Sequence, residues 1–129
     1  MSIGTKIHIS NPKKLIIGND SHIGYNSLFF FGGGGNAIIS IGENVWLGPR
    51  VSVCTVSHMI GNEGKRASTS IHDSVMIENG CWIGMNATIL PGVTIARGCV
   101  IGASALVNKD TEPNGLYVGV PARRIKDLP

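Results

Sequence analysis

An aliphatic residue recurs at every sixth position along most of this chain. The same spacing holds in two shorter runs upstream, at 17–29 and 41–53, and it is unbroken at Ile71, Ile77, Ile83, Ile89, Ile95, Ile101 and Val107. An α-helix repeats near 3.6 residues and a half-buried strand at 2, so neither accounts for a period of six. The pattern predicts a parallel β-helix, in which each six-residue unit supplies one short strand and one corner.

A second, smaller residue follows four positions after the aliphatic one. We expect both positions to point into a narrow triangular prism with three units in each coil. Inward side chains of successive coils then stack about 4.8 Å apart, the spacing of neighbouring strands. The smaller residues are Ser21, Ser27, Val45, Val51, Val75, Ala87, Val93 and Ala105, and two cysteines, Cys81 and Cys99, take the same place. The prediction is an all-β fold in one domain, residues 1–129.

Three stretches interrupt the repeat. Pro12 accompanies a slip between Ile9 and Ile17, which predicts an irregular first coil. The run Gly32-Gly33-Gly34-Gly35 indicates a bent corner or a close approach of another molecule. In the third, Lys65 falls on an inward position, and lysine is almost never fully buried without a partner. We therefore expect residues 59–70 to leave the prism as a protruding loop, with phase kept on either side.

The repeat stops after Val107. Turn-forming residues follow, and we expect residues 108–129 to cap the open end of the solenoid, because solenoids need a polar terminal unit. The segment 119–126 is expected to form a short turn or helix within this cap. Its basic residues, together with one just after the repeat, fit either a solvated cap or a pocket for phosphate; they are Lys109, Arg123, Arg124 and Lys126.

Composition and charge exclude several classes of protein. Charged residues make up 15% of the chain and the net charge is +3, which is far less basic than a nucleic-acid-binding face. The first ten residues lack the apolar core of a signal peptide, and no apolar run has the length of a membrane span, so we expect a cytoplasmic protein. Three cysteines without metal-type spacing are expected to stay reduced.

His58 is the histidine best placed for chemistry. It stands at the foot of the predicted loop, and loops held by rigid scaffolds often carry functional residues. Neutral imidazole can accept a proton at cellular pH. The remaining histidines show no ligand spacing with one another, so we expect no metal site.

Two longer stretches resemble a known family. Residues 83–95, with the sequence IGMNATILPGVTI, and the ending VGVPAR at 118–123 resemble the left-handed β-helix acyltransferases. The resemblance is greatest to the branch of galactoside, maltose and polysaccharide O-acetyltransferases, and it extends over roughly residues 71–126. It implies a left-handed β-helix, use of acetyl-CoA as acyl donor, and a homotrimer with three active sites between subunits.

The resemblance also implies roles for individual residues. His58 falls where the family places its catalytic base. Trp82 matches a tryptophan near the thioester, and two further positions match backbone contacts to the pantetheine arm, while four match contacts near the nucleotide. These six are Met85 and Ala103, then Asn108, Lys109, Arg123 and Lys126. In the family a hydroxyl residue stands at the position of Asn108 and an arginine at that of Lys126. We expect the helical segment that precedes the repeat in the sugar-acetylating relatives to have no counterpart here, so the acceptor-binding residues of that segment are not assigned.

Together these observations predict an acetyl-CoA-dependent O-acetyltransferase that acts on a hydroxyl of a sugar or of a surface-polysaccharide precursor. Transfer is expected to be direct, with His58 as general base and no acyl-enzyme. Three alternatives remain open at this point: an N-acetyltransferase for an amino-sugar nucleotide, a serine O-acetyltransferase, and a trimeric β-helix scaffold without catalytic activity. A small-molecule or glycan acceptor is the expected partner, and nucleic acid is not.

Overall fold

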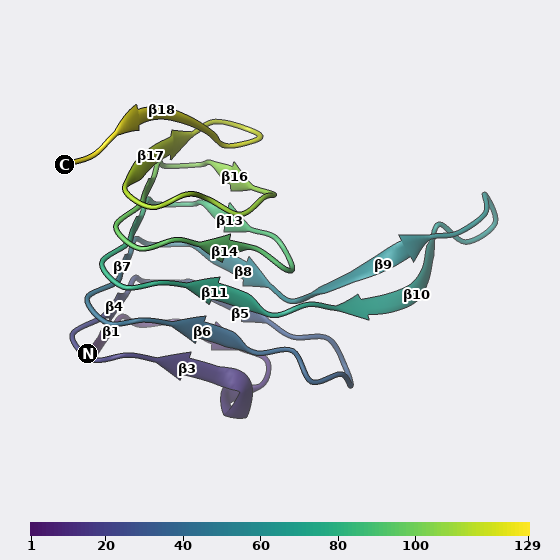
Figure 1. The fold of residues 1–129 in the computed structure, drawn as a ribbon. Helices are drawn as coiled ribbons and strands as arrows, with labels where there is room; N and C mark the ends of the chain where they lie inside the picture. Colours follow the sequence, from purple (N-terminus) through teal and green to yellow (C-terminus); the bar gives the residue numbers. More distant parts are fainter.

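Three β-sheets form the sides of a prism, and the chain adds one short parallel strand to each sheet in every coil (Figure 1). The structure is a computed structural model and describes residues 1–129. Sheet A contains β1 (Ser2–Ile3), β4 (His22–Ile23), β7 (Trp46–Leu47), β12 (Trp82–Ile83), β15 (Val100–Ile101), β17 (Gly115–Val118) and β18 (Arg123–Asp127). Sheet B contains β2 (His8–Ile9), β5 (Leu28–Phe30), β8 (Ser52–Cys54), β13 (Thr88–Ile89) and β16 (Leu106–Val107). Sheet C contains β3 (Leu15–Ile17), β6 (Ile39–Ile41), β11 (Val75–Ile77) and β14 (Thr94–Ile95).

The inward positions of the six-residue unit form one continuous core. The aliphatic residues from Ile77 to Val107 are each 1% exposed or less, and all the smaller residues predicted to point inward are buried as well. Ser21 shows how a polar side chain is accommodated there. Its hydroxyl donates to the carbonyl of Gly42 at 2.7 Å and accepts from the amide of Val45 at 3.0 Å. The predicted all-β solenoid with two inward positions per unit is confirmed.

Every interruption of the repeat falls at one corner, where the chain passes from sheet B to sheet C. A regular step between inward residues takes six positions. Here the step is eight positions from Ile9 to Ile17, twelve from Phe29 to Ile41, and 24 from Val53 to Ile77. The extra residues form, in stacking order, the 3-10 turn η1 (Pro12–Lys14), a glycine-rich turn at 32–35, and an antiparallel hairpin of β9 (Val56–Ile60) and β10 (Ala67–His72). The hairpin projects far from the prism (Figure 1).

Ile71 does not belong to the core, contrary to the prediction from its spacing. It lies in β10, opposite Ser57, and is 37% exposed. The step from Val53 to the next inward residue, Ile77, is a multiple of six. Ile71 therefore keeps the six-residue spacing although it lies in the hairpin, outside the prism. The protruding segment is a strand pair over Val56–His72, wider than the loop expected at 59–70.

The turn expected within 119–126 is present at 119–122, whereas residues 123–127 form the strand β18 and no helix. β17 adds to sheet A in parallel, and β18 returns antiparallel to it, with Leu116 opposite Lys126 and Val118 opposite Arg123. Both strands lie at the C-terminal end of the solenoid (Figure 1). The backbone groups of β17 offer an unpaired edge, and pairing satisfies them better than an isolated turn would. None of the helical segments has the length and hydropathy that a membrane crossing requires.

Two of the three cysteines are part of the core. The thiol of Cys81 donates to the carbonyl of Ala96 at 3.1 Å, and that of Cys99 donates to the carbonyl of Glu112 at 3.0 Å. Burial raises the pKa of Cys81 to about 11. Cys54 is half-buried, at the end of β8. All three are free thiols.

We expect a maleimide reagent to label Cys54 in the native protein at pH 8 and to spare Cys81. A thiol with a pKa of about 11 is about one part in a thousand thiolate at that pH, and the core shields it as well. Mass spectrometry of digested protein measures the label at each site, and labelling in concentrated guanidinium serves as the control. Equal labelling of Cys54 and Cys81 in the native protein would contradict the buried placement.

Candidate functional site: an apolar groove along sheet A

An apolar groove of about 540 Å³ runs along the outer face of sheet A and its corner with sheet B. Its floor is a ladder of outward side chains on neighbouring strands, since Trp46, Trp82, Val100 and Leu116 are aligned by register. Both tryptophans are 55% exposed. A run of exposed apolar surface of this size marks a site for a ligand or a partner.

The corner residues of two coils form the wall of this groove. Gly84-Met85 and Gly102-Ala103 stack on each other there, and the empty Cβ position of Gly84 lies 2.6 Å from the Ala103 nitrogen. Neither the Met85 amide nor the Ala103 amide donates a hydrogen bond within the chain. Two free backbone donors beside an apolar floor suit an elongated ligand with amide carbonyls along an apolar arm. The structure thus brings Trp82, Met85 and Ala103 together.

The four predicted nucleotide contacts gather at the C-terminal end of the prism. Asn108 is exposed directly after β16, and Lys109 and Arg123 line one hollow of about 180 Å³. Lys126 lies on β18 opposite Leu116, the groove residue nearest that end. The basic end and the apolar groove are therefore neighbours on adjoining strands. This arrangement offers positive charge where an elongated anionic ligand would leave the groove.

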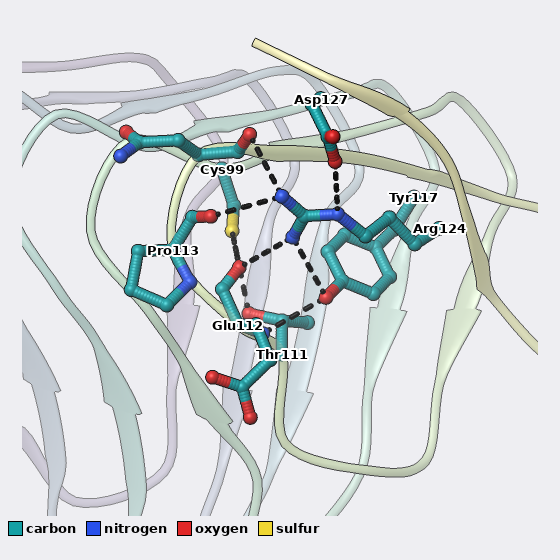
Figure 2. A network of polar contacts seen from close by, with 8 residues as sticks. Cys99, Thr111, Glu112, Pro113, Tyr117, Arg124 and Asp127 are labelled. Atoms are coloured by element: carbon teal, nitrogen blue, oxygen red, sulfur yellow. Dashed lines mark hydrogen bonds and ion pairs between the residues drawn. The ribbon is translucent and has the colours of Figure 1, made fainter.

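Arg124 differs from its basic neighbours because its guanidinium is fully engaged within the chain (Figure 2). It forms an ion pair of 2.9 Å with Asp127 and donates to the Tyr117 hydroxyl at 3.3 Å. It also donates to the carbonyls of Glu112, Pro113 and Asn114 at 3.1 to 3.2 Å. Hydrogen bonds to Tyr117 and then to Asp127 raise the pKa of Arg124. Arg124 thus ties β18 to the turn before β17 and is not free to bind phosphate.

His58 lies at a different corner of the same chain. It stands on β9, exposed, with Ser70 opposite it on β10. The hairpin leaves the prism between sheets B and C (Figure 1), whereas the residues that line the groove lie on sheet A and at its corner with sheet B. Within one chain the structure therefore does not bring His58 to Trp82. No group of three or more His, Cys, Asp or Glu side chains is placed to hold a metal ion.

The groove contains one aromatic residue, Trp46, to which the family resemblance gives no role. Trp46 precedes an inward aliphatic residue, as Trp82 does, and it lies one coil below Trp82 on the same floor. Its indole stacks on the His22 ring, with centroids 4.0 Å apart and planes at 26°. The equivalent place of the two tryptophans in the repeat is the signal in the sequence that could have identified Trp46.

The chain matches a family model described as "Bacterial transferase hexapeptide (six repeats)" over residues 69–109. It is 32% identical to the galactoside O-acetyltransferase of Escherichia coli, over 98% of this chain and 64% of that protein. It is 46% identical to a putative acetyltransferase of Schizosaccharomyces pombe, over 71% of this chain and 44% of that protein.

A solved structure covers almost the whole chain. A hexapeptide-repeat-containing acetyltransferase of Vibrio cholerae superposes with a TM-score of 0.90 at 32% identity, over 99% of this chain and 70% of that one. The same protein is also known in complex with acetyl coenzyme A, and that form superposes with a TM-score of 0.88. This chain spans from under half to about two thirds of the length of the two curated relatives above.

Proposed function

This chain belongs to the hexapeptide-repeat acetyltransferase family, and we propose that it transfers an acetyl group from acetyl-CoA to a hydroxyl of a small-molecule or glycan acceptor. The groove carries this proposal. Its apolar floor, its two free corner amides and the basic end beside it match an acetylated pantetheine arm followed by phosphates. The acetyl-CoA complex of the Vibrio cholerae protein adds support, because that fold is shared throughout this chain.

Each predicted contact has a part in holding the donor. Trp82 supports the thioester end against its indole face, and the amides of Met85 and Ala103 donate to the pantetheine carbonyls. Lys109, Arg123 and Lys126 supply positive charge for the phosphates, and Asn108 supplies an amide where relatives have a hydroxyl. A backbone amide at the groove would donate to the oxyanion that forms as the thioester carbonyl is attacked.

His58 acts as the general base in this proposal. Its imidazole removes the proton of the acceptor hydroxyl while the oxygen attacks the thioester carbon. The carbon–sulfur bond then breaks and CoA leaves as a thiolate, a good leaving group that needs no strong acid. No covalent acyl-enzyme forms, and neither of the buried cysteines is required. A direct transfer of this kind requires that His58 lies next to the thioester bound in the groove.

The separation of these two features within a chain favours an active site between subunits. His58 lies at the corner of sheets B and C, and the groove lies at the corner of sheets A and B. In a ring of three copies, one corner of each prism adjoins a different corner of its neighbour. A homotrimer would thereby place the hairpin of one subunit over the groove of the next. The exposed face that carries Trp46 and Trp82 would then be covered by the neighbouring subunit, as large exposed apolar surfaces usually are.

We infer that the acceptor carries a sugar hydroxyl, as in a surface-polysaccharide precursor. The support is similarity to a galactoside O-acetyltransferase over nearly all of this chain. Acceptor amines and serine would be acetylated by the same chemistry, and product analysis distinguishes them. A panel of sugars, amino-sugar nucleotides and serine, each incubated with acetyl-CoA, gives acetylated product with the true acceptor class alone.

Binding of acetyl-CoA tests the proposed function directly. We expect titration calorimetry to show binding, and Trp82→Ala to weaken it about tenfold, since removal of the indole ring from the groove costs about 1.4 kcal/mol. Ile16→Ala is the control, because Ile16 is similarly exposed at 53% but lies on sheet C. Absence of binding by the wild type would favour a scaffold without catalytic activity. Equal weakening by both variants would remove the groove from the binding site.

A further inference from the structure

The ring of His72 is seated against the glycine-rich turn of the coil below. His72 ends β10, and a Cβ built on Gly35 would lie 2.5 Å from its Cγ and 2.8 Å from its Nδ1. A Cβ on Gly32 would lie 3.0 Å from its Cε1 and 2.7 Å from a methyl carbon of Val56. Real Cβ atoms do not approach this closely, so the imidazole fills space that only glycine leaves open.

The contact is made by the hairpin face that carries His58. The register places His72 opposite Val56 and Ser70 opposite His58. Side chains alternate along each strand, and directly opposed residues share a face, so these four residues lie on one side of the hairpin. A shift of His72 against the turn therefore moves the face on which the proposed base stands.

Most other side chains of the hairpin have no support from the prism. Those of β9 beyond Val56 are all exposed, and in β10 only Ser68 and His72 are partly covered. Val56 and His72 are thus the two residues at the foot of the hairpin that contact another coil, and both contact the glycine-rich turn. His58 lies on β9 only two residues after Val56, so it is close to this contact.

The turn is itself held firmly by its neighbours. Lys14, at the end of η1, donates from Nζ to the carbonyl of Gly35 at 2.7 Å. Ser10 accepts from the amide of Phe31 at 2.7 Å at the start of the turn. At its end, Ser74 accepts from the amide of Ile38 at 3.0 Å. The turn therefore links the first coil to the hairpin base as a stack of fixed contacts.

We propose that His72 is a positioning residue, which sets the angle of the hairpin through the glycine turn so that His58 meets the acceptor and the thioester in the adjoining groove. This inference rests on the proposed function. His72 touches neither substrate in this role. Its effect is geometric, and a displacement of 1 Å at a reacting group can lower a rate about a hundredfold.

Gly35→Ala, compared with Gly34→Ala, tests the inference. Both glycines have left-handed backbone, with φ of +71° and +77°, so alanine introduces the same kind of backbone strain at either position. Only the new methyl group on Gly35 meets the His72 ring, since nothing lies within 4 Å of the position on Gly34. We expect Gly35→Ala to lower kcat at least tenfold with an unchanged KM for acetyl-CoA, and Gly34→Ala to lower it less than twofold.

A double-mutant cycle with His72→Ala separates positioning from general damage. His72→Ala removes the ring without straining the backbone, and it should lower kcat by a similar factor. In that background the methyl group on Gly35 no longer meets a ring, so Gly35→Ala should have no further effect beyond that of Gly34→Ala. Equal kcat for the two glycine variants, or an undiminished effect of Gly35→Ala without His72, would overturn the inference.

Hydrogen exchange gives a second readout that does not depend on acetyl transfer. Gly35→Ala should speed exchange of the β9 and β10 amides several-fold while the core strands stay protected, and Gly34→Ala should not. Unchanged exchange in the hairpin of the Gly35 variant counts against the inference even if no acceptor is acetylated. Altered hairpin exchange in the Gly35 variant of a protein that never transfers acetyl would instead refute the proposed function and leave the mechanical contact established.

Discussion

His58→Ala lowers kcat for acetyl transfer by two orders of magnitude or more, within the range of about 10² to 10⁴ that a general base contributes. The physical reason is that a neutral hydroxyl is a weak nucleophile until its proton is removed during attack. His58 is exposed on β9 and contributes nothing to the core, so folding and acetyl-CoA binding should be unchanged. Steady-state kinetics, with release of free CoA as the signal, measures the effect.

His8→Ala is the control for removal of an exposed histidine. His8 lies on the outer face of β2 in the first coil and lines none of the hollows described above. Its variant should retain wild-type kcat. Turnover by His58→Ala at the wild-type rate would refute the role of base and direct attention to other groups on the hairpin.

Gly24→Ala lowers the free energy of unfolding by about 3 kcal/mol. A Cβ on Gly24 would overlap the carbonyl of Gly48 in the next coil and lie 2.6 Å from the Pro49 nitrogen. Those atoms belong to backbone and not to the end of a flexible side chain, so relief requires that two coils move apart. Because coil spacing is set by the hydrogen bonds of all three sheets, that movement breaks contacts beyond the corner.

Gly33→Ala provides the comparison. Nothing lies within 4 Å of its Cβ position, and its backbone does not require glycine, so its unfolding free energy should stay within about 0.5 kcal/mol of wild type. Urea unfolding at one fixed protein concentration measures both variants, since stability of an oligomer depends on concentration. Equal midpoints for the two variants would show that the stacked corners tolerate a methyl group.

Much of the fold could be predicted from the sequence because the inward residues repeat every six positions. Ile83, Ile89 and Ile95 each pair with the residue at the equivalent inward position one coil away, so a local pattern repeats as a tertiary contact. Gly24 and Gly48 follow the same rule at the corners. In such a solenoid, sequence spacing and spatial stacking are nearly the same information.

Ile71 and the tail show where that equivalence ends. Ile71 keeps the period although its strand has left the prism, because spacing does not distinguish a coil from an insertion of matching length. The tail carries no periodic pattern, and its pairing as β18 depends on the unpaired edge that β17 presents. In both cases the segment is placed by strand pairing with another part of the chain, and its local sequence does not indicate that pairing.

The candidate site divides in the same way. From sequence alone came the scaffold, the run of inward positions, and the identity of Trp82, Met85 and Ala103 through the family resemblance. Only the tertiary structure showed that these residues share a groove with Trp46. It also showed that the Arg124 guanidinium is bound by Tyr117 and Asp127, and that His58 lies at another corner of the prism. The hexapeptide period specifies where each residue lies around the prism, whereas insertions and tails are placed by contacts between coils, which no spacing encodes.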